Sequence, residues 1–211
     1  MKDGLGTLVY ADGSKYDGEW KNDSANGKGK WVNSRGDQYE GELVADKANG
    51  FGRYTYANGF VYEGEWKDDK FHGRGKEIWV DKTVVVCDYV NGNKEGRGEI
   101  SFVDGSNYVG DFHNDTITGT GCFKYSDGKT YQGTFVDGMM HGEGVTIWKD
   151  GRIYRGGYSN NKKQGYGEFK FQDGRVYKGE WRNGRQNGSG EIVQTNGEIM
   201  TGFWKDGKLQ A

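Results

Sequence analysis

Proline is absent from this chain of 211 residues, and cysteine occurs only twice. Without proline, no X-Pro segment marks a linker, so the sequence indicates no domain boundary. Two lone cysteines argue against a disulfide framework and favour a reducing compartment, so we expect a cytoplasmic protein. No apolar run approaches the roughly 18 residues that cross a bilayer, and no signal-peptide pattern is found.

Aliphatic residues are also scarce, because only 33% of the chain is hydrophobic while 15% is aromatic and 28% is charged. This composition disfavours a thick core between two layers, whereas large aromatic rings can stabilise a thin sheet. No segment shows apolar residues at the 3.6-residue spacing of a helix. We therefore expect an all-β fold with a single layer.

Glycine, in contrast, is abundant and regularly spaced. A Gly-x-Gly pair recurs nine times at intervals of 23 residues, from Gly4/Gly6 to Gly188/Gly190, and such a period is typical of a repeat array. With position 1 set at Tyr16, position 1 is tyrosine in seven of nine copies, while position 3 is glycine and position 5 aromatic in eight. We expect one continuous array over 1–211, cut from a longer one, with partial repeats at 1–15 and 200–211 around eight full repeats at 16–199.

Each repeat predicts one β-hairpin. In the segment 62–66 (Tyr-Glu-Gly-Glu-Trp), acidic residues alternate with aromatic residues and glycine, which predicts one packed and one solvated strand face. We expect the glycine between the two aromatics to leave room for a ring from a neighbouring strand. Pairs such as Asp127-Gly128 favour tight turns. Stacked antiparallel hairpins, with strands about 4.8 Å apart, predict an elongated rod on the order of 80–90 Å long.

No catalytic pattern is found. A dinucleotide-binding fingerprint needs a strand, a third glycine and a helix, and no helix is expected after these Gly-x-Gly pairs. Acidic pairs such as Glu63 and Glu65 recur at the same repeat positions, whereas a catalytic pair is expected once. We therefore predict that the chain is not an enzyme and holds no cofactor.

One hairpin combines residue types that bind zinc, namely His113, Asp115 and Cys122. A closed tetrahedral site needs four ligands. Zinc binding here would therefore need a second chain, as at a dimer contact, or a neighbour such as Cys87. The alternative is that these residues are ordinary members of the sheet.

The net charge of −2 argues against nucleic-acid binding. Basic residues are densest near the C-terminus, at Arg175, Lys178, Arg182 and Arg185. Because anionic lipid surfaces are bound by clusters of about 4–8 basic residues, this group is a candidate phospholipid patch. The alternative is a solvated face of mixed charge.

A single-layer sheet leaves aromatic surface uncovered, and such surface usually marks an interaction site. The partial repeat at the C-terminus has an unpaired strand edge and carries Met200, Phe203, Trp204 and Leu209. We predict that these residues form a two-fold homodimer interface. An aromatic groove along the array is expected to hold a helix or extended peptide of a protein partner.

The segments Tyr62-Glu63-Gly64-Glu65-Trp66 and His141-Gly142-Glu143-Gly144 resemble the MORN (membrane occupation and recognition nexus) repeat, and the resemblance covers the whole chain. Val85 and Cys87 depart from the pattern, and Lys82 replaces a turn glycine. We expect a local irregularity there, such as a bend.

The chain is most similar to the all-repeat MORN proteins of protozoan parasites. That resemblance implies an elongated, dimeric, non-enzymatic scaffold of cytoskeletal or membrane-cortex assemblies, including those of cell division. A phosphoinositide-binding module that acts at membranes is the alternative function.

Overall fold

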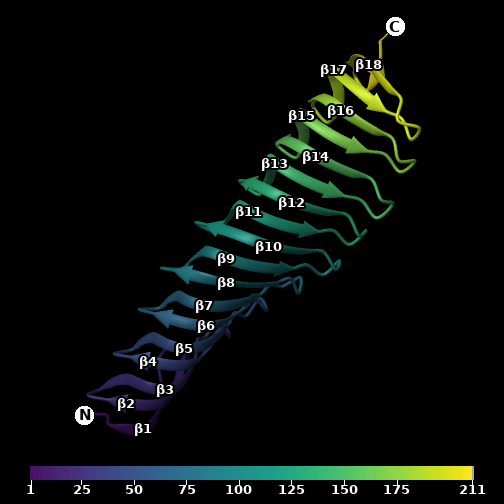
Figure 1. Ribbon diagram of the computed structural model, residues 1–211. Coiled ribbons are helices and arrows are strands. Elements are labelled where there is room, and N and C mark those ends of the chain that lie inside the picture. Colours follow the sequence, from purple (N-terminus) through teal and green to yellow (C-terminus); the bar gives the residue numbers. More distant parts are fainter. Residues whose placement is uncertain (211) are drawn as a thin grey trace. The chain divides into compact units, whose positions relative to one another are not determined.

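The computed structural model describes residues 1–210, which fold into β-strands joined by turns (Figure 1). It divides into two compact units, the first holding residues 1–103 and 113–115, the second 104–112 and those from 116 onward. The described residues contain no helix, and so none that has the length and apolar character needed to cross a membrane. The prediction of an all-β chain is confirmed.

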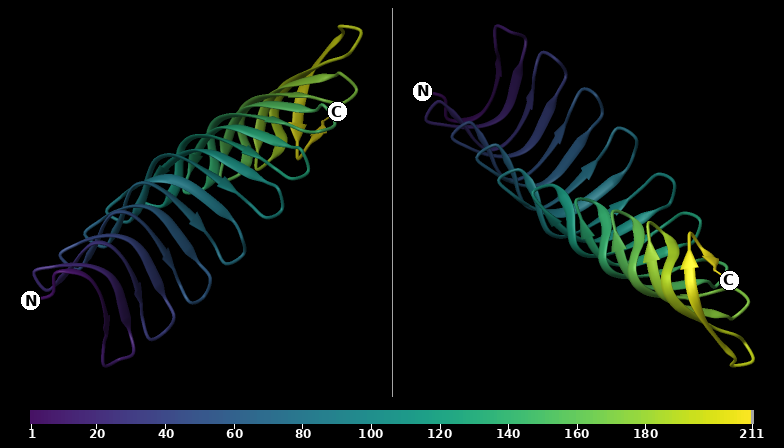
Figure 2. Two further views of the ribbon diagram at one scale, coloured as in Figure 1. Left: turned by 90° about the horizontal axis from the view of Figure 1, so that it is seen from below. Right: turned by 90° about the horizontal axis from the view of Figure 1, so that it is seen from above.

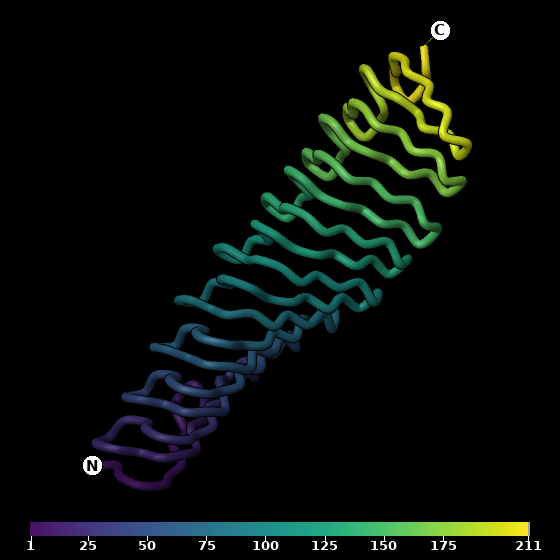
Figure 3. The backbone as a smooth tube through the Cα atoms, viewed as in Figure 1, coloured from purple at the N-terminus to yellow at the C-terminus, as the bar shows by residue number. Residues whose placement is uncertain are grey.

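The strands alternate between seven and nine residues along most of the chain, and Figure 3 traces their order. The first unit holds β1 (Gly4–Val9), β2 (Lys15–Lys21), β3 (Ser24–Val32), β4 (Gln38–Val44), β5 (Lys47–Thr55), β6 (Val61–Lys67), β7 (Lys70–Ile78), β8 (Val84–Val90) and β9 (Asn93–Ser101). The second unit holds β11 (Thr116–Lys124), β12 (Thr130–Val136), β13 (Met139–Ile147), β14 (Ile153–Ser159), β15 (Lys162–Lys170), β16 (Val176–Arg182), β17 (Arg185–Val193), β18 (Ile199–Lys205) and β19 (Lys208–Leu209), together with β10 (Asn107–His113) except for His113.

Within each unit, strands that follow one another in the chain pair antiparallel in a single layer. The hairpins are curved rather than flat in both units (Figure 2). The predicted single-layer array of about nine hairpins is confirmed. The rod-like extent stays a prediction.

A two-residue turn closes each hairpin at repeat positions 7 and 8. Asn22 and Asp23 show the geometry, because their φ angles are 50° and 67°. Two successive left-handed residues form a type I′ turn, whose twist matches that of the flanking strands. Asx turns follow the nine-residue strands, as where Asn58 Oδ1 accepts the Phe60 N–H at 2.9 Å after β5. The predicted Asp-Gly turns therefore connect successive hairpins, and the hairpins themselves close elsewhere.

The tyrosine at position 1 explains the glycines at positions 3 and 14. The Tyr16 hydroxyl donates to the Glu19 carbonyl at 2.9 Å, so its ring lies along its own strand. A Cβ on Gly18 would meet this hydroxyl at 2.5 Å, and a Cβ on Gly29, which pairs with Gly18 across the hairpin, would enter the ring itself. The prediction that the glycine between the two aromatics leaves room for a ring from a neighbouring strand is therefore wrong, because the tyrosine of the same strand takes the space at Gly18. The glycine that makes room for a ring from a neighbouring strand is Gly29, at position 14.

Edge-to-face ring contacts join successive repeats. In the second unit, tyrosines at position 1 alternate with aromatics at position 5, with ring centroids 5.1–5.5 Å apart. Such pairs add about 0.5–1.5 kcal/mol each to the burial of their area. In the first unit Leu43 and Val85 replace rings of this series and interrupt it. This aromatic ladder supplies the packing that a second layer provides in other β-proteins.

The expected irregularity between Lys82 and Cys87 is absent from the turn but present in the strand pairing. The register of β8 and β9 shifts between Val86 and Asp88, at Cys87, whereas Gly18 at the same repeat position pairs with Gly29. Lys82 adopts the left-handed φ of 75° that glycine has in the other copies. The turn keeps its hydrogen bond from the Trp79 N–H to the Thr83 carbonyl, at 2.9 Å. Cys87 is fully buried at the glycine position, where Val85 leaves the space that a tyrosine would fill.

Candidate binding site

The side chain at repeat position 10 enters a space among aromatic residues, which we call the position-10 slot. Its residue varies along the chain: Lys2, Ala25, Ala48, Phe71, Lys94, Ile117, Met140, Lys163, Gln186 and Leu209. At Lys163 the slot is bounded by positions 1 and 16 of the same repeat, position 18 of the repeat before and position 5 of the repeat after. The same repeat positions line a cavity beside Ala25 and Ala48. What the slot contains therefore depends on one variable residue.

Lys163 of β15 shows the slot at its most enclosed. Its Nζ lies 4.2 Å from the ring centroid of Phe169, 4.4 Å from Trp181, 4.9 Å from Tyr154 and 5.0 Å from Trp148. Aromatic faces carry negative charge density and attract cations at these distances. Four rings thus surround one ammonium group.

Burial, with a smaller contribution from repulsion by Arg152, lowers the pKa of Lys163 to about 8. The cause is the loss of hydration, because the rings replace only part of the water that stabilises the ammonium group. The slot therefore accepts an ammonium group and holds it with little contact to solvent.

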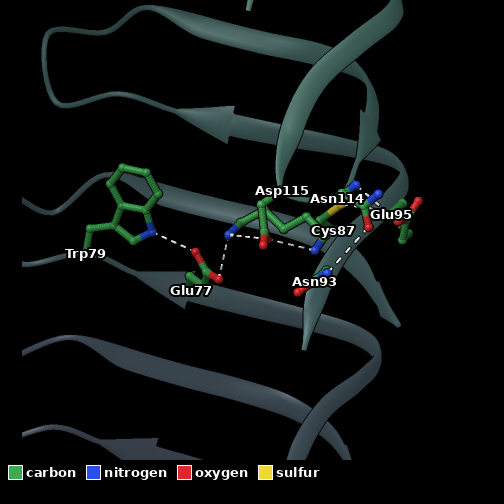
Figure 4. Close-up of polar contacts among 8 residues, drawn as sticks. Glu77, Trp79, Cys87, Asn93, Glu95, Asn114 and Asp115 are labelled. Atoms are coloured by element: carbon green, nitrogen blue, oxygen red, sulfur yellow. Dashed lines mark hydrogen bonds and ion pairs between the residues drawn. The ribbon is translucent and has the colours of Figure 1, made fainter. Parts of the chain in front are cut away.

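Lys94 of β9 fills its slot in another way (Figure 4). Its Nζ lies 2.8 Å from Glu77 Oε1 and 3.6 Å from Asp115 Oδ1. Trp79 Nε1–H donates to the second oxygen of Glu77 at 2.7 Å, so the carboxylate has two partners. The side chains of Lys94 and Glu77 are 13% and 6% exposed, which makes this a buried, hydrogen-bonded ion pair. Here carboxylates hold the ammonium group that rings hold at Lys163.

Two adjacent slots of the first unit have only alanine at position 10. Beside Ala25 and Ala48 lies a cavity of about 400 Å³. Its walls are mostly aromatic, being formed by Tyr10, Tyr16, Trp31, Tyr39, Leu43, Tyr54 and Trp66, with Asp46 and Asp69 at the same cavity. The cavity is thus a pair of position-10 slots that the chain does not fill with side chains of its own.

Asp46 and Asp69 are fixed at this cavity by the hairpin turns. The Oδ1 of Asp46 accepts the Ala25 N–H at 2.7 Å, and that of Asp69 accepts the Ala48 N–H at 2.8 Å. The backbone N–H of each aspartate donates in return to the same alanine, at 3.0 and 3.1 Å. Within residues 1–210 neither carboxylate forms an ion pair. Two carboxylates are therefore held at the aromatic cavity without a cation.

The residues predicted for a dimer interface divide into two groups. Trp204 is only 2% exposed and packs edge to face on Tyr177, so it faces the interior of its own unit. Met200, Phe203 and Leu209 are 48%, 56% and 44% exposed. Because β19 pairs only with the last two residues of β18, no described strand covers residues 199–202 on that side. Of the four residues predicted for the dimer interface, Met200, Phe203 and Leu209 are therefore exposed at an open strand edge, and Trp204 is not.

The residues predicted for a lipid patch also divide. Arg175 pairs with Asp173 at 2.8 Å, and Lys178 lies 3.9 Å from Glu191. Arg182 and Arg185 face each other across the hairpin of β16 and β17. Together with Lys205 they line a surface hollow of about 720 Å³. Two of the four predicted residues are therefore neutralised by neighbours, and Lys205 joins the other two.

The residues predicted for a metal site do not converge on one point. Two of them form hydrogen bonds with other residues, and the third is exposed. His113 Nδ1 lies 3.1 Å from Glu95 Oε2, and its Nε2 lies 3.1 Å from Asn114 Nδ2. Asp115 accepts the Lys94 N–H at 2.9 Å. Cys122 is exposed, whereas Cys87 is buried, which raises the pKa of its thiol. Among residues 1–210, no three His, Cys, Asp or Glu side chains are grouped as a metal ion would require.

Comparison with known proteins gives a clear result at the level of the repeat. The model of the MORN repeat family matches residues 1–15, 16–38, 39–61, 62–84, 88–107, 108–130, 131–151, 154–174 and 177–199. The matched segments begin at 16, 39 and 62, where the sequence predicts the repeats to begin. No match was found among curated proteins.

Several solved structures resemble the chain at low identity. The G-box domain of the microcephaly protein CPAP is 14% identical, with a TM-score of 0.44 over 96% of this chain and 100% of that one. The TCP domain of Drosophila melanogaster SAS-4, in complex with a proline-rich motif of Ana2, is 14% identical, with a TM-score of 0.39 over 93% and 88%. The TCP10 domain of Danio rerio CPAP, in complex with a STIL peptide, is 14% identical, with a TM-score of 0.37 over 97% of each.

Proposed function

The chain belongs to the MORN repeat family, and from that premise we propose that it is a non-enzymatic scaffold for protein assemblies of the cytoskeleton or membrane cortex. In this role it acts in the cytoplasm and contributes to cell division. The observation that carries the proposal is the aromatic cavity beside Ala25 and Ala48, because a monomeric protein seldom leaves such surface without a binding role.

The recurring acidic residues support a structural role rather than catalysis. Exposed pairs join neighbouring strands, as at Lys30 and Glu40, 3.9 Å apart, and at Arg53 and Glu63, 3.4 Å apart. Exposed pairs of this kind contribute at most about 1 kcal/mol each. Such pairs recur along the sheet, as expected for a solvent-exposed strand face that carries charges of both signs. MORN repeats are also a non-enzymatic repeat module.

Filling the cavity tests the scaffold. We expect Ala48→Phe to reduce by at least about fivefold the fraction of purified protein that sediments with a detergent-insoluble cytoskeletal preparation, since the ring occupies the partner's place. The fold already tolerates the change, because Phe71 stands at the same repeat position in the next repeat. Ala57→Phe, at an exposed turn of the same unit, is the control. Equal sedimentation of wild type and Ala48→Phe contradicts the proposal.

We also propose that the open edge of β18 forms a homodimer. The double substitution Met200→Ser and Phe203→Ser is expected to weaken the dimer about tenfold or more, because it removes the exposed apolar side chains of that edge. Light scattering after size exclusion measures the mass. Ile147→Ser, which changes an equally exposed strand residue of the same unit, is expected to leave the dimer unchanged. A zinc ion held between two chains by His113, Asp115 and Cys122 is proposed separately from this edge, and a chelator added to the same measurement tests it.

The hollow around Arg182, Arg185 and Lys205 favours a phosphoinositide-binding module as the alternative function. Each basic residue near an anionic surface contributes about 1 kcal/mol, so Arg182→Ser with Arg185→Ser is expected to weaken vesicle binding about 30-fold at low salt. Arg175→Ser is the control, because that arginine is already paired with Asp173. Vesicle co-sedimentation that is absent, or insensitive to the double substitution, rules out this alternative.

A further inference from the structure

Three repeats carry lysine at position 10, and all three place the ammonium group over an aromatic ring. For Lys2 and Lys163 the ring is at position 5 of the next repeat, whereas for Lys94 it is at position 5 of the same repeat. The distances from Nζ to the ring centroid are 4.5 Å for Lys2 and Trp20, 5.6 Å for Lys94 and Tyr89, and 4.4 Å for Lys163 and Trp181. The surroundings differ otherwise, since one lysine is caged by rings and another by carboxylates. The position-10 slot is therefore a recurrent receptor for an alkylammonium group.

The slot at Ala48 has the components of this receptor without the lysine. It is lined by Tyr39, Tyr54 and Trp66, which occupy the same repeat positions as three of the rings around Lys163. The adjoining slot at Ala25 has its own set of rings, with Leu43 in place of the position-5 aromatic. The resulting cavity has about 400 Å³ of space, enough for two alkyl chains.

The charge of the empty slots also favours a cation. Asp46 and Asp69 stand at position 8, where the slot of Lys163 has Gly184. The carboxylates would compensate the loss of hydration that lowers the pKa of the caged Lys163. An anion would meet the aromatic faces and both carboxylates, and a neutral apolar group would gain nothing from the two negative charges beside it.

We propose that the slots at Ala25 and Ala48 bind two lysine side chains of a partner polypeptide, one ammonium group in each slot. The inference rests on the proposed scaffold function and names the chemistry of its partner. The partner's lysines occupy the places that Lys2, Lys94 and Lys163 occupy in their own repeats, with Asp46 and Asp69 as counterions.

The spacing of the slots defines the partner further. Neighbouring slots are one repeat apart, which is two strands or about 10 Å. A polyproline II segment rises about 3.1 Å per residue with three residues per turn, so residues i and i+3 lie on one side about 9 Å apart. In a β-strand, residues i and i+3 point to opposite faces. A Lys-x-x-Lys motif in polyproline II conformation therefore fits both slots.

A labelled peptide with the sequence Gly-Lys-Pro-Pro-Lys-Pro-Gly provides the probe, and fluorescence anisotropy with the full chain measures its binding. We expect the peptide to bind at least about tenfold more tightly than its analogue with norleucine in place of both lysines, which keeps the alkyl chain and removes the charge. In the complex, NMR is expected to show upfield ring-current shifts of the lysine ε-methylene protons. Equal affinity of the two peptides, or no binding of either at millimolar concentration, overturns the proposal.

Substitutions in the chain test whether the peptide binds in the two slots. Asp46→Asn with Asp69→Asn is expected to weaken the lysine peptide about tenfold. The turns are expected to persist, because Asn161 stands at the same repeat position and its Oδ1 accepts the Met140 N–H at 2.8 Å. Asp23→Asn is the matched control, because the slot beside it already holds Lys2.

Ala48→Lys is expected to close one slot with the chain's own ammonium group and to weaken the peptide similarly. Peptide binding that none of these substitutions changes lies elsewhere and contradicts the proposal. The scaffold function is judged separately. If Ala48→Phe abolishes cytoskeletal sedimentation while the lysine peptide does not bind, the scaffold stands and the ammonium chemistry is wrong.

Discussion

Replacing Gly29 by alanine is expected to lower the free energy of unfolding by about 3 kcal/mol, the upper range for overpacking a filled core. The new methyl group would enter the Tyr16 ring, which is buried and held by its hydroxyl bond to the Glu19 carbonyl. The ring has little room to move, because Trp20 packs against it edge to face at 5.0 Å. Urea unfolding, followed by tryptophan fluorescence, measures the loss.

Gly6→Ala is the matched control for this prediction. Gly6 occupies the same repeat position and the same unit, but the partial first repeat provides no position-1 tyrosine. A Cβ on Gly6 would lie 3.5 Å from the nearest atoms of Trp20, which is ordinary contact. We expect a change within about 0.5 kcal/mol. In a Tyr16→Ala background, Gly29→Ala is expected to be nearly neutral, and a full loss there contradicts the steric explanation.

The period, the strand pattern and the single layer could be predicted because each depends on residue type at fixed spacing. The tyrosine and glycine at positions 1 and 3 recur together, and alternation places them on one face. What alternation does not reveal is that the tyrosine ring lies along its own strand. That orientation depends on a hydroxyl bond three residues ahead, as from Tyr62 to the Glu65 carbonyl at 2.9 Å.

The position-10 slot could not be predicted from the repeat pattern, because its residue changes from one copy to the next. A consensus discards such a position, although its variation decides whether a slot is filled by a ring, an aliphatic chain or an ammonium group. One signal was present in the sequence. Glu77 is acidic at a position that is apolar or aromatic in most other copies, and the structure pairs it with Lys94.

Trp204 illustrates the opposite difficulty. The sequence placed it at an unfinished edge, and an unpaired edge suggests exposed side chains. Side chains of a strand alternate between faces, however, and Trp204 points to the aromatic ladder, where Tyr177 covers it. Its neighbour Phe203, on the other face, is 56% exposed. Alternation could have separated the two residues, since position 5 is the packed position in the other repeats.

The contribution of Lys163 to the stability of the chain is expected to rise between pH 7 and pH 9.5 by as much as about 2 kcal/mol. Cys87 and buried tyrosines such as Tyr62 and Tyr131 oppose it in the same window, because burial raises their pKa values in the folded protein. Burial lowers its pKa to about 8 in the folded protein, whereas the unfolded chain keeps the ordinary lysine value of 10.5. At Lys163 the unfolded state binds more of the proton than the folded state in this window, so the contribution of this residue to stability increases with pH. The attraction of the four rings for the cation opposes this shift, which makes 2 kcal/mol the upper value.

The substitution Lys163→Gln isolates this effect, since Gln186 fills the same slot in the next repeat and shows that the fold accepts the side chain. Urea unfolding at the two pH values is expected to show the free energy of unfolding of wild type rising relative to that of the variant, because both proteins keep the tyrosines and Cys87. Lys162→Gln, which changes the exposed neighbour, is expected to behave as wild type. Parallel pH dependence of wild type and Lys163→Gln contradicts the assignment. A rise that disappears only with Lys163 shows that an enclosed ammonium group lacks a counterion, which Asp46 and Asp69 offer at the two empty slots.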